Sequence, residues 1–162
     1  MSARAGIYDF TDEAAREFYL LLPTVVIGYD FITISDLKFN VSAGFGYSSF
    51  KYNSDRHHVY MMPVFLSAIY CIPLEGSKVS LYAGGGFSLA GKADKNLTFA
   101  KSHYSFTYGY HVLGEMDFKL NEKLSLSLDI RYNLLMPPSL EELNISGVVT
   151  TVGVVIPLYK GQ

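Results

Sequence analysis

The sequence has no tryptophan, a single cysteine and few charged residues for its length. Cys71 has no second cysteine to pair with, which excludes an internal disulfide framework. Charged residues make up 17% of the 162 positions and the net charge is −2. Typical soluble domains carry about 25% charged residues. Nucleic-acid-binding proteins usually have a strong basic surface, so no nucleic-acid partner is expected.

No segment has the length of a membrane-spanning helix. The longest run without a charge or histidine is VYMMPVFLSAIYCIPL at 59–74. A spanning helix needs about 20 residues, and Pro63 and Pro73 interrupt this run. The opening residues MSARAGIYDF contain no apolar signal-peptide core. A location outside the cytoplasm would therefore require a signal peptide that preceded this sequence and was removed.

The sequence is rich instead in alternation of apolar and polar residues, the period-2 pattern of a β-strand with two different faces. Helical signal is confined to 11–18, which lies in a connection. Eight alternating segments are expected to form one domain over 1–162, with strands at 3–10, 23–32, 37–50, 58–72, 78–90, 103–119, 124–134 and 146–158.

The connections between these segments alternate in length. Those at 33–36, 73–77 and 121–123 are short, whereas the others are mostly longer. Outer-membrane barrels have short periplasmic turns and longer extracellular loops. The fold prediction is therefore all-β, an eight-stranded antiparallel up-and-down transmembrane barrel. Any protein partner is expected to bind through the longer connections at 11–22, 51–58, 91–102 and 135–145.

The two faces of the strands differ in a way that indicates which one is outside. One face carries ranks of Leu, Phe and Tyr, and the other is rich in Gly and Ser with a few ions. The interior of an eight-stranded barrel is only just wide enough for side chains, so the bulky apolar face is expected to contact lipid. The alternative is a soluble ligand-binding barrel or sandwich whose apolar faces meet. The predicted lipid-facing residues include Leu81, Phe87, Phe106, Leu126, Leu128 and Ile130.

Tyrosines near strand ends or on apolar faces are expected to form aromatic girdles at the two membrane interfaces, because the ring is apolar and the hydroxyl is polar. The candidates are Tyr60, Tyr70, Tyr104, Tyr108, Tyr110 and Tyr132.

Charged residues on the inward face must be paired in a narrow, poorly hydrated lumen. A three-residue link at 121–123 would place Leu120 beside Leu124 and Glu115 opposite Asp129. Two adjacent carboxylates repel, so cations are expected between them. One is Arg131, diagonal to Glu115, and the other is Lys38 or Arg4. These charges are expected to form a structural plug of ion pairs inside the barrel. Its predicted members are Arg4, Lys38, Glu115, Asp117, Asp129 and Arg131. The alternative is that Glu115 and Asp129 form a catalytic acid pair.

Several stretches resemble a known family. MMPVFLSAIYCIPLEGSKVSLYAGGGFSLAG, GEMDFKLNEKLSLSLDIRYNLL and ISGVVTTVGVVIPL are similar to strand–turn–strand and final-strand motifs of small bacterial outer-membrane barrels, the OmpA-like and opacity-protein-like group. The resemblance implies an outer-membrane location, lipid and lipopolysaccharide as surroundings, and no shared catalytic residues. One departure concerns the terminal aromatic residue that the assembly machinery reads. Leu158 and Tyr159 are followed here by three more residues.

A second resemblance points to an enzyme. His103, Ser105 and Glu115 are similar to the His-x-Ser pair and downstream Glu of outer-membrane lipid A 3-O-deacylases, in which His would activate the Ser hydroxyl. The Asn that follows that Ser is Phe106 here, and the Asn-Pro-Gly stretch is missing. His57 and His58 with Asp55 form a candidate metal site, but neighbouring residues on a strand point to opposite faces.

The preferred interpretation is thus a non-enzymatic barrel without cofactor or metal, a structural anchor or surface-interaction protein acting through its longer loops. It could serve as an accessory subunit of a larger outer-membrane assembly. The alternatives are the lipid A-modifying barrel enzyme and the soluble ligand-binding barrel.

Overall fold

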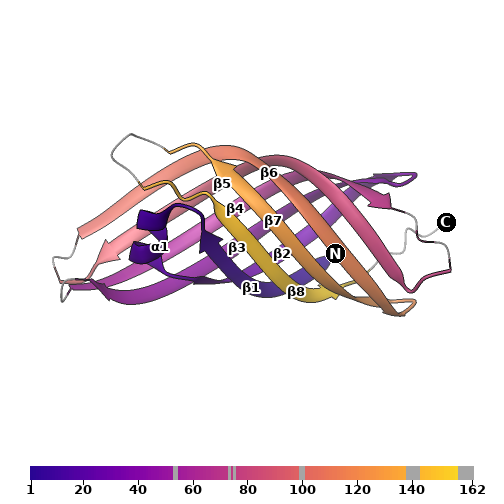
Figure 1. The fold of residues 1–162 in the computed structure, drawn as a ribbon, viewed down its shortest axis with the longest axis horizontal. Helices are drawn as coiled ribbons and strands as arrows, with labels where there is room; N and C mark the ends of the chain where they lie inside the picture. The colour runs from indigo at the N-terminus through magenta and orange to yellow at the C-terminus, as the bar shows by residue number, and fades with distance from the viewer. Residues whose placement is uncertain (53–54, 73, 75, 99–100, 138–142, 157–162) are drawn as a thin grey trace.

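The computed structural model describes residues 1–52, 55–72, 74, 76–98, 101–137 and 143–156. Eight antiparallel strands form a closed barrel in which each strand pairs with its sequence neighbours and β1 also pairs with β8 (Figure 1). The eight-stranded barrel predicted from the sequence is confirmed. The strands are β1 (Ser2–Phe10), β2 (Leu22–Ile34), β3 (Leu37–Tyr52), β4 (Asp55–Ile72), β5 (Val79–Asn96), β6 (Lys101–Asn121), β7 (Leu124–Leu135) and β8 (Gly147–Val155).

One short helix, α1 (Glu13–Tyr19), lies in the connection between β1 and β2. Asp12 caps it, since its side chain accepts a hydrogen bond of 2.9 Å from the backbone N–H of Ala15. The helix ends where Leu20 adopts a positive φ of 58°, a conformation that α-helices cannot continue through. No helix in the described ranges is long and apolar enough to cross a membrane.

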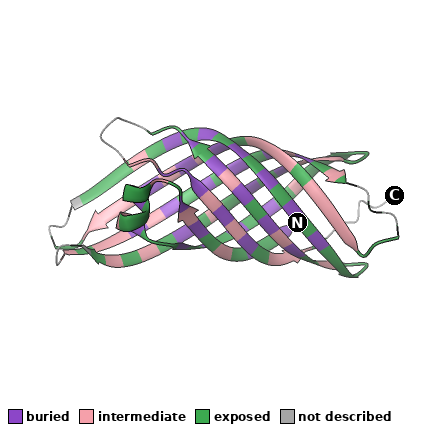
Figure 2. Ribbon diagram, viewed as in Figure 1, coloured by how far each residue is buried: buried purple, intermediate pink, exposed green. Residues whose placement is uncertain are grey.

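The strands alternate between buried inward residues and exposed outward residues (Figure 2). On β6, Glu115 is 4% exposed and Phe106 is 64% exposed. Leu81 and Leu128 are half-buried, but both pair with Met116, which is 42% exposed, so they share its outward face. The other predicted lipid-facing residues are also exposed, namely Phe87, Phe106, Leu126 and Ile130.

The lumen holds more than the small residues and ions that its sequence pattern indicates. A cluster of buried apolar side chains fills part of it, and α1 contributes Ala15 and Tyr19 to this cluster. Glycine also permits close approach of neighbouring strands, because a side chain at Gly86 would collide with the backbone of Leu66 on β4. The buried apolar side chains, which we call the lumen cluster, are those of Tyr8, Phe10, Ala15, Tyr19, Leu22, Val26, Val59, Met61, Phe65, Ala90, Leu135, Ile145 and Val149.

Two of the predicted loops are largely strand, which corrects their boundaries. Within 51–58, β3 continues to Tyr52 and β4 begins at Asp55. Within 91–102, β5 continues to Asn96 and β6 begins at Lys101. These hairpins therefore extend the barrel wall past the last apolar rank. Helix α1, the last residues of β7 and the first residues of β8 lie at the same end, and we call this end the loop rim. The opposite end, with the short turns and the N-terminus, is the turn rim (Figure 1).

Candidate functional site

The interior charge network is centred on Glu115. Arg4 Nη2 lies 2.9 Å from Glu115 Oε2, and Lys38 Nζ lies 3.3 Å from Glu115 Oε1. The side chains of Arg4 and Glu115 are 4% and 2% exposed. Arg4 Nε also donates a 3.2 Å hydrogen bond to Ser127. Because β1, β3 and β6 meet only across the lumen, these contacts depend on barrel closure.

Arg131 contacts a different carboxylate from the one expected. Its Nη2 lies 3.3 Å from Asp129 Oδ2 on the same strand, and its Nη1 donates to Ser42 Oγ at 3.0 Å. Its guanidinium carbon also sits 4.2 Å from the centre of the Phe65 ring, a cation–π arrangement. The expected position of Arg131 between the two carboxylates is therefore wrong: it contacts Asp129, while Arg4 and Lys38 together hold Glu115.

The register between β6 and β7 places Glu115 opposite Asp129. The turn differs from the expected one, because Asn121 pairs with Leu124 and the register shifts by one residue at Leu120. Asp117 shares the inward face and is 6% exposed. Its Oδ1 has no hydrogen-bond partner in the described part of the chain.

A second polar network runs along the inner wall over the neighbouring strands β4 to β7, where Ser67, His111 and Asn133 lie on one row of the ladder. Ser88 Oγ donates to Asn133 Oδ1 at 3.1 Å, so it accepts from Nδ1–H of His111 at 2.9 Å. His111 Nε2 is then the acceptor for the hydroxyl of Ser67 at 2.9 Å. A Ser–His pair can generate a nucleophile, but all four side chains are at most 3% exposed. This network joins four strands and is closed to substrate.

Helix α1 packs against the lumen at the loop rim. The hydroxyl of its Tyr19 accepts a 2.9 Å hydrogen bond from Lys92 Nζ, which is buried on β5. The ring of Phe18 meets that of Phe50 edge-on, with centroids 5.2 Å apart. The connection at 11–21 is therefore bound to the wall by buried contacts, although its sequence indicates only a polar turn or two.

The arrangement expected for lipid A deacylation is not assembled. Glu115 follows His103 by twelve positions on the same strand, and a rise of about 3.3 Å per residue separates them by roughly 40 Å. His103 is instead the cross-strand partner of Asp94. Both line a hollow at the loop rim with His57, Asn96 and Ser102. The alternative grouping of His103, Ser105 and Glu115 therefore does not form a triad.

The two adjacent histidines point to different faces of β4. His57 points inward, where its Nδ1 lies 3.3 Å from Asp94 Oδ1 and its ring stacks on Phe50. His58 points outward and shares a 2.6 Å hydrogen bond with the hydroxyl of Tyr47. No cluster of three His, Cys, Asp or Glu side chains suited to a metal occurs among the described residues. The candidate metal site at Asp55, His57 and His58 is therefore contradicted.

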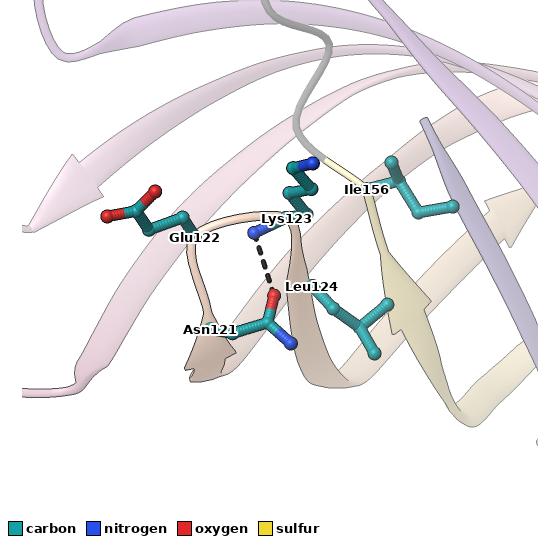
Figure 3. A pocket seen from close by; sticks show the side chains of 5 residues that line it. All are labelled: Asn121, Glu122, Lys123, Leu124 and Ile156. Atoms are coloured by element: carbon teal, nitrogen blue, oxygen red, sulfur yellow. Dashed lines mark hydrogen bonds between the residues drawn. The ribbon is translucent and has the colours of Figure 1, made fainter.

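A hollow at the turn rim lies between the β6–β7 turn and the end of β8 (Figure 3). It is lined by Asn121, Glu122, Lys123, Leu124 and Ile156, and the backbone N–H of Lys123 donates to Asn121 Oδ1 at 2.8 Å. Its lining has no nucleophile paired with a base. Leu158 and Tyr159, the expected assembly signal, lie outside the described residues, as do residues 138–142 of the last long connection.

The fold is shared with several solved outer-membrane proteins. Neisserial surface protein A matches with a TM-score of 0.67 and 21% identity, covering 96% of this chain and 95% of that one. Ail, the attachment invasion locus protein of Yersinia pestis, matches at 0.56 and 14%, covering 94% of each chain. The outer membrane enzyme PagL matches at 0.59 and 11%, covering 98% of this chain and 100% of that one. No protein-family model and no curated protein sequence matches the chain.

The chain is an eight-stranded barrel of the outer-membrane type. The resemblance to small outer-membrane barrels seen in the sequence is confirmed at the level of the fold. An outward surface made of ranks of exposed Leu, Ile, Val, Phe and Tyr side chains requires lipid around it. The expected location in a bacterial outer membrane follows from that surface on this fold. Structural neighbours include both surface proteins and an enzyme, so fold alone leaves the activity open.

Proposed function

We propose that the chain is a non-enzymatic outer-membrane barrel that acts through its loop rim, as an anchored surface-interaction protein. The observation that carries this proposal is the combination of a filled lumen with a wall that extends past the apolar ranks. Glu115, His111 and Arg131 are each at most 4% exposed and bonded within the lumen. The interior thus stabilises the barrel, and the rim remains the surface for partners.

The loop rim has the chemistry of a binding surface. The hairpins β3–β4 and β5–β6 carry polar residues on both faces once the apolar ranks end, with Phe50 among the inward ones. His57 stacks on Phe50 and contacts Asp94, which holds two hairpins together. A rigid, polar rim of this kind suits recognition of a soluble or surface-bound partner. Contact between this rim and other subunits would make the chain part of a larger assembly.

The competing function is modification of lipid A, the reaction class of an outer-membrane barrel enzyme. A nucleophile for that reaction must reach an acyl ester in the outer leaflet, at the outward surface of the barrel. Ser105 and His103 are on the inward face of β6, by their register with Lys92 and Asp94. The geometry therefore favours the non-enzymatic function.

Surface labelling tests the proposal. In a Cys71→Ala background, Thr98→Cys introduces a thiol at the loop rim, and Glu122→Cys introduces a matched thiol at the turn rim; both positions are exposed. A membrane-impermeant maleimide added to intact cells should label Thr98→Cys and leave Glu122→Cys unlabelled until the outer membrane is permeabilised. Labelling of Glu122→Cys alone would mean that the barrel has the opposite orientation, with the turn rim and not the loop rim at the cell surface.

A further inference from the structure

Outward-facing charges are confined to two places on the barrel. Asp9 on β1 is one, and it is paired with Arg16 of α1 at 3.1 Å. The remaining ones are all cations on three adjoining strands near the loop rim: Lys51, Arg56 and Lys95, with the imidazole of His58 among them. Other outward strand positions with described side chains are uncharged. We call these four residues the basic patch.

The register brings the patch together. Lys51 on β3 is the direct partner of Arg56 on β4, and His58 on β4 is the direct partner of Lys95 on β5. Direct partners have Cβ atoms about 5 Å apart on one face of a sheet. The two pairs lie two residues apart along β4, a rise of about 7 Å. Four nitrogen-bearing side chains therefore share one small area of the outer wall.

Carboxylates in the same region point the other way. Asp94 faces inward and contacts His57, and Asp55 accepts from the side chain of Asn96 at 3.4 Å. The acids of this region thus face inward, and the three cations of the patch face outward. No salt bridge involves Lys51, Arg56 or Lys95 in the described part of the chain. The patch has a net positive field directed away from the barrel.

The position of the basic patch along the barrel axis indicates which layer of the membrane it contacts. On β4 the outward residues change along the strand from Met62 through Tyr60 and His58 to Arg56. Tyr47 and Tyr60 form an aromatic pair with centroids 5.1 Å apart, and Lys95 Nζ lies 5.4 Å from the centre of the Tyr60 ring. Aromatic girdles mark the boundary between hydrocarbon and headgroups. Cations one step beyond the girdle are therefore at the depth of the headgroups in the outer leaflet.

Resting on the proposed outer-membrane location, we propose that the basic patch is a binding site for the phosphorylated headgroup of an outer-leaflet glycolipid, such as the diphosphorylated sugar of lipid A. Arg and Lys bind phosphate oxygens through charge-assisted hydrogen bonds. Tyr47 fixes the imidazole of His58, and the Tyr60 ring positions Lys95, so the donors are partly preorganised. The site is on the outward face of the wall at headgroup depth, at the base of the β3–β4 and β5–β6 hairpins.

Native mass spectrometry of the purified full chain in a non-ionic detergent tests the site. The probe is diphosphoryl lipid A, with monophosphoryl and dephosphorylated forms as comparison ligands. The triple variant Lys51→Gln, Arg56→Gln, Lys95→Gln should bind diphosphoryl lipid A roughly a hundredfold more weakly, on the basis of the contribution of each cation near an anionic surface. Its preference for the phosphorylated forms should disappear.

The matched control is Lys78→Gln, Lys119→Gln, Lys123→Gln, which removes the same charge from exposed positions at the turn rim. It should keep wild-type affinity. A compact band on unboiled gels checks that both variants are folded. Equal affinities for the wild type and the patch variant would overturn the site. Patch-dependent binding of heparin without any binding of lipid A would also overturn it, as would patch-dependent binding of inorganic phosphate without any binding of lipid A.

These outcomes are distinct from failure of the proposed function. If the folded barrel inserts into membranes but binds phosphorylated and dephosphorylated lipid A equally, only the proposed patch site is contradicted. A chain that stays dispersed in water without detergent would remove both.

Discussion

Glu115 and Asp129 are direct partners across β6 and β7, yet each carboxylate contacts its own cations. Glu115 lies 2.9 Å from Arg4 and 3.3 Å from Lys38, whereas Asp129 lies 3.3 Å from Arg131. Like charges placed directly opposite each other destabilise a sheet. The adjacent carboxylates are compatible with the fold because cations from β1, β3 and β7 surround them. Removal of Glu115 therefore leaves uncompensated cations in the lumen, and removal of Arg131 leaves Asp129 without its cation.

The first prediction concerns Glu115→Gln. This change leaves Arg4 unpaired in the lumen and removes the partner of Lys38, so the free energy of unfolding should fall by about 3–5 kcal/mol, the usual cost of breaking a buried ion pair. Urea titration of the folded barrel in detergent, followed by the shift between folded and unfolded gel bands, measures the loss.

Two double variants check which cation is the partner. Glu115→Gln with Arg4→Met should recover part of the lost stability, because an absent pair costs less than an unpaired charge. Glu115→Gln with Arg131→Met should lose more, since Asp129 would then be unpaired as well. The opposite ranking would mean that Arg131 is the main partner of Glu115 in solution.

The second prediction tests the outward face. Phe87 lies near the middle of β5. Phe87→Arg should therefore make the free energy of folding into lipid less favourable by about 2–4 kcal/mol, as an arginine near the bilayer midplane does. Leu126→Arg lies close to the turn rim on β7 and should cost less, because the penalty falls toward the interface. Refolding yields into lipid vesicles measure both.

Ser127→Ala is the inward control for these variants. It removes one hydrogen bond from Arg4 and should cost about 1 kcal/mol. A larger loss from Ser127→Ala than from Phe87→Arg would mean that the two faces are reversed.

The alternation of side chains was sufficient to predict the barrel and the direction of its faces. It failed at the ends of the strands around 51–58 and 91–102. The apolar rank stops where the hydrocarbon stops, but backbone pairing continues beyond it, as at Lys51 with Arg56 and at Asn96 with Lys101. A strand outside the hydrocarbon needs no apolar face, so its continuation leaves no period-2 signal.

The sequence was sufficient to predict which charged residues face the interior, but not which residues they contact there. Arg4, Lys38 and Glu115 could be assigned to the inward face from alternation alone. Their contacts depend on which strands face each other across the closed lumen, which no local spacing encodes. The Ser67–His111–Ser88 network joins neighbouring strands instead, and finding it requires the register of the β4–β5 and β5–β6 pairs. Phe65 was missed for another reason: both faces of β4 are apolar around it, so alternation does not separate the inward residues from the outward ones.

The third prediction concerns permeability. The lumen cluster and the two polar networks fill the interior, and α1 packs over the loop-rim end. Planar-bilayer recordings of the pure protein should therefore show no stable large conductance. Recordings with protein-free detergent provide the baseline. Reproducible open channels above that baseline would require a water-filled path through the described lumen.

The last prediction separates the anchor from the enzyme. If the chain has no deacylase activity, lipid A extracted from cells that make the wild type should have the same acylation as lipid A from cells that make His103→Ala. His103 lies at the loop rim beside Asp94, and Glu115 is about 40 Å away along β6, held by Arg4 and Lys38. Glu115→Gln should accordingly reduce stability without changing lipid A, whereas His103→Ala should change neither strongly.

Mass spectrometry of extracted lipid A, from strains with equal amounts of folded barrel on unboiled gels, makes this comparison. Ser105→Ala is the matched control, because it removes the candidate nucleophile with a minimal change of volume. A deacylated lipid A species present with the wild type and absent with both His103→Ala and Ser105→Ala would contradict the non-enzymatic function. Because Glu115 is far from both residues, the carboxylate of such an enzyme would have to be Asp94, which pairs with His103 across the β5–β6 ladder. Asp94→Asn would then abolish the same species.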